Sequence, residues 1–225
     1  MLILIVVPAY NEEKMVGEVV KGLNEFNYEV VVVDDGSKDN TSQIAKNAGA
    51  VVLRHFINRG QGAALQTGFD YAKKVGADIV VTFDADGQNK PEEVAKIIEP
   101  LLIGQIDVAL GSRFMERKSN VPLIKKIVLR GGILFERLFV GVKLSDAHNG
   151  FRAFSKKAIN LIELNQDKMA HATEVIQEIK KHKLKFQEVP VTMRYTEYSK
   201  QKGQSVFNSI KIVSDLFLSK VISKK

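Results

Sequence analysis

The sequence predicts an α/β protein: a mostly parallel sheet flanked by helices, with a small antiparallel element and a C-terminal amphipathic helix. Apolar, β-branched runs recur at residues 2–7, 29–33, 50–53, 78–83 and 106–110, and their starts lie 21 to 28 residues apart. Helical patterns fill the intervals, and this alternation is typical of βα units on a parallel sheet. Several runs are apolar at consecutive positions, which indicates strands buried on both faces.

Composition and charge limit the kinds of site and partner that the protein can have. The 225 residues include no cysteine, so disulfides and thiolate metal sites are excluded. Residues 1–100 hold 10 Lys and Arg against 15 Asp and Glu, whereas residues 101–225 hold 23 against 11. The basic second half favours a polyanion or an anionic surface as partner, the alternative being a solvated lysine face. No nucleic-acid-binding motif accompanies the charge, so nucleic acid is not an expected partner.

No run approaches the roughly 20 apolar residues of a membrane-spanning helix. The apolar start, residues 1–7, lacks a basic leader and reads as a buried strand rather than a signal peptide. The expected location is cytoplasmic, or peripheral on the cytoplasmic face of a membrane.

Polar residues follow the first three runs, where parallel sheets bind ligands. After the first run, Tyr10 could stack on a planar base and Glu12 could accept its hydrogen bonds; alternatively, Asn11 caps a helix starting near Glu12. After the second, Asp35 is placed to contact a base or a ribose hydroxyl. After the third, residues 58–64 are small enough for a tight helix start or a close backbone approach to a ligand.

The fourth run leads into the most informative stretch, Asp84-Ala-Asp-Gly-Gln88. Asp84, Asp86 and Gln88 offer only oxygen ligands, which suit Mg²⁺ or Mn²⁺ together with substrate phosphates. The alternative is an acidic turn that caps a helix near Pro91. The fifth run ends near Arg113, whose guanidinium could bind phosphate oxygens.

The second half departs from regular alternation. We expect an apolar, basic helix over residues 121–141, then a turn and a short strand within residues 146–154, and a strand over residues 185–193. Asp146 is either a general base or a turn former. Arg194 and Lys200 lie in a loop that could close over a diphosphate.

From Ser205 onward, apolar residues recur at helical spacing among lysines. This pattern predicts a C-terminal amphipathic helix. Such a helix either docks on its own domain or meets a membrane surface or a partner.

Taken together, these segments resemble family 2 glycosyltransferases of the GT-A fold, in particular the dolichol-phosphate mannosyltransferase and polyprenyl-phosphate sugar transferase group. The motifs occur in order: PAYNEE at 8–13, VDDGSKDNT at 33–41, NRGQGAA at 58–64, DADGQ at 84–88, GSR at 111–113 and NGFRAF at 149–154, with Arg194 and Lys200. The resemblance implies one domain over residues 1–225, with a nucleotide-sugar half at 1–115 and an acceptor half at 116–225.

The resemblance also assigns roles. It implies that the nucleoside is held by Pro8, Tyr10, Glu12, Val33 and Asp35. It implies that Asp84, Ala85 and Asp86 meet the sugar nucleotide, that Asp84, Asp86 and Gln88 bind the divalent cation, and that Arg113, Arg194 and Lys200 bind diphosphate or acceptor phosphate. Asp84, Asp86, Asp146 and Arg194 form the expected catalytic set.

The sequence departs from this group in three places. Asn149 replaces a frequent Ser, residues 196–204 differ from the usual Gly-Glu-Ser-Lys-Leu pattern, and the frequent C-terminal membrane region is missing from this sequence. These departures bear on the acceptor rather than on the donor chemistry.

The expected reaction is metal-dependent, inverting transfer of a hexose from a nucleoside diphosphate sugar of the GDP-mannose or UDP-glucose type to a polyprenyl or dolichyl phosphate. One alternative acceptor is a saccharide hydroxyl, with Asp146 as base. Alternatives of another class are a nucleotidylyltransferase and a non-catalytic nucleotide-binding module.

Overall fold

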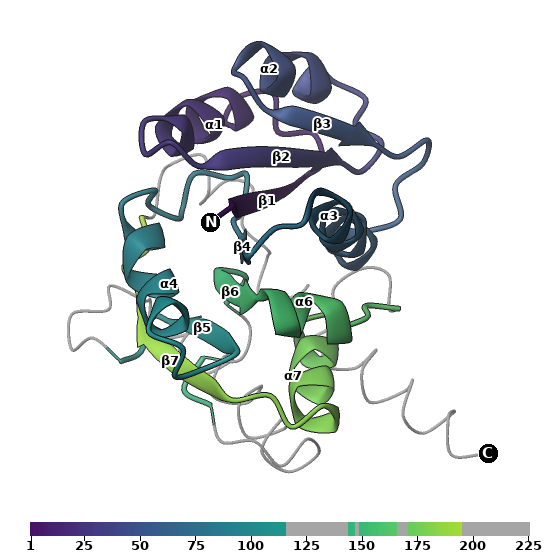
Figure 1. Cartoon of the computed structure of the whole chain (residues 1–225). Coiled ribbons are helices and arrows are strands. Elements are labelled where there is room, and N and C mark those ends of the chain that lie inside the picture. Colours follow the sequence, from purple (N-terminus) through teal and green to yellow (C-terminus); the bar gives the residue numbers. More distant parts are fainter. Residues whose placement is uncertain (116–143, 147–148, 166–170, 195–225) are drawn as a thin grey trace.

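The computed structural model describes residues 1–115, 144–146, 149–165 and 171–194. Within these ranges one seven-stranded sheet has the order β3-β2-β1-β4-β6-β5-β7 (Figure 1). Its strands are β1 (Ile3–Ala9), β2 (Glu29–Asp34), β3 (Val51–Arg54), β4 (Ile79–Thr82), β5 (Val108–Ser112), β6 (Arg152–Ser155) and β7 (Phe186–Pro190). The five predicted βα strands and the two later ones are therefore present, with ends shifted by one to a few residues.

The sheet is mostly parallel, as predicted. Strands β1, β2, β3 and β4 pair in parallel, and so do β5 and β7. Strand β6 lies between β4 and β5 and is antiparallel to both. Because β6 runs in reverse, its first residue, Arg152, pairs with Thr82 near the end of β4, and the turn before it reaches the carboxyl edge.

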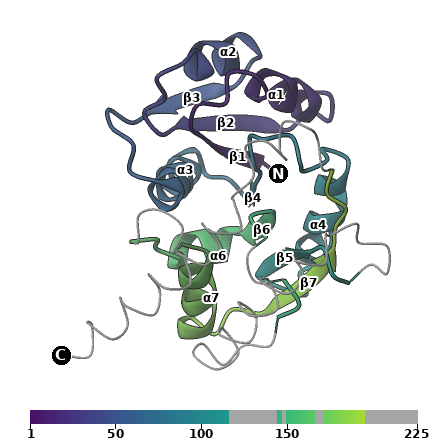
Figure 2. The ribbon, with the colours of Figure 1, turned by 180° about the vertical axis from the view of Figure 1, so that it is seen from behind.

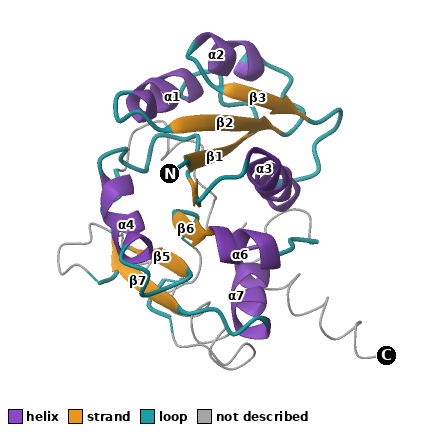
Figure 3. Ribbon diagram, viewed as in Figure 1, coloured by secondary structure: helices purple, strands orange, loops and turns teal. Residues whose placement is uncertain are grey.

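Helices cover both faces of the sheet, as Figure 3 shows. They are α1 (Val16–Asn24), α2 (Thr41–Asn47), α3 (Gln61–Val75), α4 (Glu93–Leu102), α6 (Lys156–Leu161) and α7 (His171–Lys181). In the reverse view of Figure 2, α3, α6 and α7 remain grouped apart from α1 and α2. No helix in the described ranges is long and apolar enough to cross a membrane.

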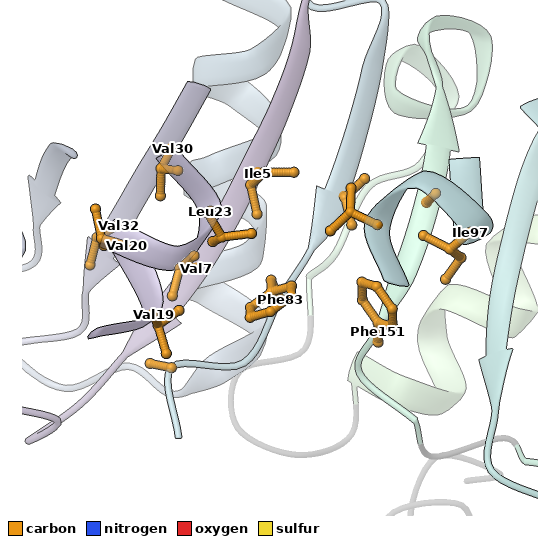
Figure 4. Packing of buried hydrophobic residues seen from close by; sticks show 14 of the residues in the cluster. Ile5, Val7, Val19, Val20, Leu23, Val30, Val32, Phe83, Ile97 and Phe151 are labelled. Atoms are coloured by element: carbon orange, nitrogen blue, oxygen red, sulfur yellow. The ribbon is translucent and has the colours of Figure 1, made fainter. Parts of the chain in front are cut away.

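Alternate residues of β1 enter two separate cores. Leu4 and Val6 pack with residues of α3, α6 and α7, whereas Ile5 and Val7 pack with residues of α1, α2 and α4. Figure 4 shows the second core, where Phe83 and Phe151 meet edge to face with ring centroids 5.5 Å apart. Because β1 is buried on both faces, its residues are apolar at consecutive positions.

One predicted helix start was wrong. Helix α1 begins at Val16 rather than near Glu12, and Asn11 does not cap it. Instead, Asn11 adopts a left-handed conformation (φ 54°), and its side-chain oxygen accepts a hydrogen bond from the backbone of Lys38 at 2.9 Å. Asparagine tolerates this conformation better than most residues, which fits a turn rather than a helix entry. The helices predicted over residues 121–141 and from Ser205 onward lie outside the described residues.

Candidate active site at the carboxyl edge of the sheet

The acidic loop, residues 84–88, follows β4 and lies at the centre of the carboxyl edge of the sheet. Phe83 still donates to the carbonyl of Val6 on the neighbouring strand at 3.0 Å, so the chain leaves the sheet at Asp84. Asp84 accepts weak hydrogen bonds from the side-chain amides of Gln61, at 3.3 Å, and Asn89, at 3.4 Å. Asp86 accepts hydrogen bonds from both the backbone and the side-chain amide of Gln88. Among the described residues, the two carboxylates therefore accept hydrogen bonds from amides and form no ion pair.

The electrostatic surroundings of Asp84 oppose its ionisation. Burial, followed by the nearby negative charge of Asp86, raises the pKa of Asp84 to about 6, while Asn89, Arg113 and Gln61 act in the opposite direction. A buried carboxylate whose ionisation is opposed by a neighbouring carboxylate is suited to bind a cation, because the cation would stabilise the ionised form.

The residues present fit a divalent cation that is completed by substrate. Among the described residues, no group of three or more His, Cys, Asp or Glu side chains could hold a metal by itself. Mg²⁺ commonly takes one or two carboxylates and completes its shell with water and substrate phosphates. Asn89 is 4% exposed. Its side-chain oxygen is buried, has no hydrogen-bond partner among the described residues, and adds an acceptor beside Asp84. Gln88 contacts Asp86 through its amide nitrogen, and its direct role as a ligand stays a prediction.

Asp35, at the end of β2, is buried and accepts several hydrogen bonds. One carboxylate oxygen accepts from the His55 ring at 2.7 Å and from the backbone of Arg59 at 2.9 Å, and the other accepts from the backbone of Gly60 at 2.6 Å. The next residue, Gln61, is the one that reaches Asp84. The start of α3 thus bridges the predicted nucleoside residue and the acidic loop.

Arg113, at the end of β5, forms a two-pronged ion pair with Asp146. Its Nε and Nη2 atoms donate to the two carboxylate oxygens at 2.6 and 2.8 Å. The turn that carries Asp146 is itself bound by Glu188 of β7, which accepts from the backbones of Ser145 and Asp146. Asp146 therefore fixes the direction of the Arg113 side chain.

The backbone of Arg194 lies next to the acidic loop, and the role of its side chain in phosphate binding stays a prediction. Its backbone donates to the carbonyl of Gln88 at 2.8 Å, and its exposed guanidinium pairs with Glu92 at 3.1 Å. Lys200 lies outside the described residues.

The other predicted nucleoside residues lie at the ends of β1 and β2, or directly after them. Tyr10 is exposed, while Pro8 and Glu12 are partly exposed. Val33 and, beside the acidic loop, Ala85 are buried in the core, so either could meet a ligand only through its backbone.

Sequence reasoning missed four residues around the acidic loop and its supports: Gln61, Asn89, Gly150 and Glu188. An added Cβ at Gly150 would lie 3.0 and 3.1 Å from the carboxylate oxygens of Asp84, so the turn before β6 packs directly against that side chain. Gln61 and Gly150 fall inside the motifs NRGQGAA and NGFRAF, so the sequence did contain a pattern that could have pointed to them. Asn89 and Glu188 carry no local pattern, because their contacts depend on the sheet order.

Comparison with known proteins identifies the family of this chain. The family model described as "Glycosyl transferase family 2" matches residues 4–162. A UDP-N-acetylglucosamine–dolichyl-phosphate N-acetylglucosaminyltransferase of Methanococcus voltae is 38% identical over 98% of this chain and 96% of its own length. Dolichol-phosphate mannosyltransferase of Pyrococcus furiosus is 32% identical over 94% of this chain and 62% of its own length.

A solved structure shares the fold. It is the Mycobacterium tuberculosis glucosyl-3-phosphoglycerate synthase, in complex with Mn²⁺, UDP-glucose and phosphoglyceric acid. This structure superposes with a TM-score of 0.73 at 21% identity, covering 96% of this chain and 78% of the other. The predicted GT-A-like fold is thereby confirmed. On the family match and these two relatives, the chain belongs to glycosyl transferase family 2 and is a glycosyltransferase.

Proposed function

We propose that this glycosyltransferase moves a hexose or N-acetylhexosamine from a nucleoside diphosphate sugar to a polyprenyl phosphate, with a divalent cation in the site. The observation that carries the proposal is the convergence of Asp84 and Asp86 with Arg113 and Arg194 at one edge of the sheet. The names of the two relatives, which specify dolichyl phosphate acceptors, support the acceptor class.

Asp84 and Asp86 would hold Mg²⁺ or Mn²⁺, which would neutralise charge on the departing diphosphate. Arg194, whose backbone donates to the carbonyl of Gln88, would bring its guanidinium to the diphosphate by leaving its exposed pair with Glu92. An acceptor oxygen attacks the anomeric carbon from the face opposite the diphosphate, so the new bond forms as the old C–O bond breaks. The nucleoside diphosphate leaves with the bonding electron pair, and the configuration at that carbon inverts.

The state of Asp146 favours a phosphate acceptor over a sugar hydroxyl. A phosphate monoester is mostly ionised near pH 7, since its second pKa is about 6, and needs no strong base. A hydroxyl acceptor would need one, and Asp146 was the candidate. The Asp146 side chain is 1% exposed, and its carboxylate already accepts hydrogen bonds from both Nε and Nη2 of Arg113. The saccharide-hydroxyl alternative therefore has no open base at this position.

The nucleotidylyltransferase and the non-catalytic module make different products. A nucleotidylyltransferase would release pyrophosphate, and a binding module would release nothing. The intact acidic pair and its proximity to two arginines favour catalysis at the sugar carbon.

The test combines donor binding with product analysis. Thermal unfolding is first followed with UDP, GDP and their sugar conjugates, with and without Mn²⁺, because a ligand at 100 times its Kd stabilises the folded state by about 2.7 kcal/mol. The stabilising donor is then incubated with a short-chain polyprenyl phosphate, and the products are identified by mass spectrometry. Glycosyl phosphoprenol and nucleoside diphosphate are expected. Pyrophosphate release, or donor binding with no transfer to the lipid phosphate, would contradict the proposal.

A further inference from the structure

Two large apolar side chains project from the connection between β3 and α3. Phe56 is fully exposed, at 106% of the reference value, and Ile57 is 69% exposed. In Figure 1, β2 and β3 point toward the side of the molecule where this connection makes its outer bend. Adjacent exposed phenylalanine and isoleucine are unusual on a soluble surface, and such exposed apolar groups often mark an interaction site.

The connection is braced on its inner side, so the pair does not fold back onto the core. The backbone N–H groups of Arg59 and Gly60 donate to Asp35. An added Cβ at Gly36 would lie 2.8 Å from the backbone of Ile57, which shows how closely the β2 and β3 connections pack. The apolar pair is thus presented outward by a fixed backbone.

Positive charges surround the apolar pair. Arg54 and Arg59, three residues away or fewer, are exposed, and so is Lys38 on the adjoining connection after β2. Arg54 donates to the carbonyl of Ser37 at 2.8 Å, which brings the two connections together. Asp34 and Asp35 at the strand end are buried, and Asp34 pairs with Arg54 at 3.7 Å while 56% of the Arg54 side chain stays exposed. Asp39, next to Lys38, is partly exposed and accepts from the backbone of Glu13. The outward surface therefore combines apolar tips with exposed cations.

We propose that Phe56 and Ile57, with Lys38, Arg54 and Arg59, form a docking site for a bilayer that contains anionic lipids. Aromatic and aliphatic tips enter the boundary between headgroups and acyl chains, while cations remain at the headgroup level. The proposal rests on the proposed function, because a polyprenyl phosphate acceptor resides in a bilayer. The docking site and the acidic loop lie at the same edge of the sheet, so docking would bring the site to the membrane surface.

The chain offers a matched control at the opposite edge. Leu102 and Ile103, at the end of α4, are also adjacent and exposed, at 47% and 62%. In the sequence they are flanked by the acids Glu99 and Asp107 rather than by cations. If exposed apolar area alone drove membrane binding, the two pairs would contribute alike.

The experiment measures co-sedimentation of the full chain with two kinds of vesicle. One contains phosphatidylcholine alone, and the other also contains about 30% phosphatidylglycerol, which gives its surface a negative charge. No donor or acceptor is present. The wild type should bind the anionic vesicles, and Phe56→Ser with Ile57→Ser should reduce binding about ten-fold or more. Lys38→Glu should weaken binding only to anionic vesicles, by about five-fold or more. Leu102→Ser with Ile103→Ser should bind as the wild type does.

Further measurements distinguish membrane docking from failure of the proposed function and from dimer formation. Transfer to a short-chain, water-soluble prenyl phosphate tests the proposed function alone, and the double serine variant at Phe56 and Ile57 should retain it while losing transfer in vesicles. Unchanged thermal unfolding would show that the variants are folded. Equal vesicle binding by wild type and this variant would overturn the proposal. Light scattering that shows a wild-type dimer, dissociated by the same variant without an effect on vesicles, would assign the surface to a second copy of the chain instead.

Discussion

Arg113 and Asp146 are 33 positions apart in the sequence, yet they form an almost completely buried ion pair with two hydrogen bonds between the side chains. Nε and Nη2 of Arg113 lie 2.6 and 2.8 Å from the two carboxylate oxygens, and the Arg113 backbone donates at 3.1 Å. The exposed fractions of the side chains are only 11% and 1%. Breaking a buried pair from one side leaves the other charge uncompensated, so Asp146 is better suited to orient Arg113 than to accept a proton from substrate.

The first prediction follows from this pair. Asp146→Asn should lower stability by about 3 kcal/mol, because Arg113 keeps its charge and loses the two-pronged pair with this carboxylate. Transfer should fall modestly, with the pH profile unchanged in shape. Stability is measured by urea unfolding and the pH profile by initial rates. The matched variant Arg113→Gln, alone and combined with Asp146→Asn, gives the coupling energy. Near-complete loss of activity together with a lost pH limb would instead make Asp146 a general base.

The second prediction concerns the pH dependence of the metal-free protein. The pKa of Asp84 is raised to about 6 from an ordinary 3.8. Between these values the folded state holds a proton that the unfolded state has released, so this group lowers stability as pH rises through the window. Asp84→Asn removes the charge and should raise the unfolding free energy at pH 7.5 by about 1–2 kcal/mol, with little change at pH 4.

The control for this prediction is Asp70→Asn, on the exposed side of α3 near Lys73. It should change stability little at either pH, because surface pairs contribute little. Thermal unfolding in a chelator measures both variants. An Asp84→Asn effect of equal size at both pH values would show that the gain does not come from ionisation.

The five βα strands could be predicted from sequence because each contains a run of consecutive apolar residues, a local property. Their order could not. Strand β6 lies between β4 and β5, and that insertion brings Gly150 to Asp84 and Asn149 close to Gly111. These contacts join residues 66 and 38 positions apart, which a local pattern cannot encode. Asp84 and Asp86 could be predicted as cation ligands because two carboxylates and the end of a strand coincide in one short motif.

The hydrogen-bond partners of the site were beyond prediction for the same reason. Asp35 was expected to face a ligand, and the structure shows its oxygens accepting from His55, Arg59 and Gly60. Arg113 was expected to face phosphate, and it is held by Asp146. Strand ends locate polar residues, but only the packed loops determine which donors and acceptors remain available.

The third prediction uses the close approach of Gly150. An added methyl group would lie 3.0 Å from an Asp84 oxygen, tighter than ordinary contact, so Gly150→Ala should displace the carboxylate. Supporting contacts around ligands typically alter metal affinity by 10- to 100-fold, and we expect about a ten-fold weaker Mn²⁺ affinity in the presence of nucleotide. Calorimetry measures the affinity. Gly17→Ala is the control, because its Cβ would crowd Ile44 in the contact of α1 with α2 instead.

For Gly17→Ala, stability should fall while Mn²⁺ affinity stays as in the wild type. If both alanine variants lost stability and neither lost affinity, the carboxylate of Asp84 would not be needed for cation binding.

The last prediction concerns Asn89, whose amide nitrogen lies 3.4 Å from Asp84 and whose buried oxygen lacks a partner among the described residues. An unpaired buried acceptor costs about 1–3 kcal/mol, and a donor such as cation-bound water would relieve this cost. Asn89→Leu removes both the unpaired acceptor and the hydrogen bond to Asp84. The variant should therefore be as stable as the wild type without metal, yet gain less stability from Mn²⁺ and nucleotide. Thermal unfolding with and without these ligands measures the difference. Equal stabilisation of both proteins would show that Asn89 has no part in the cation site.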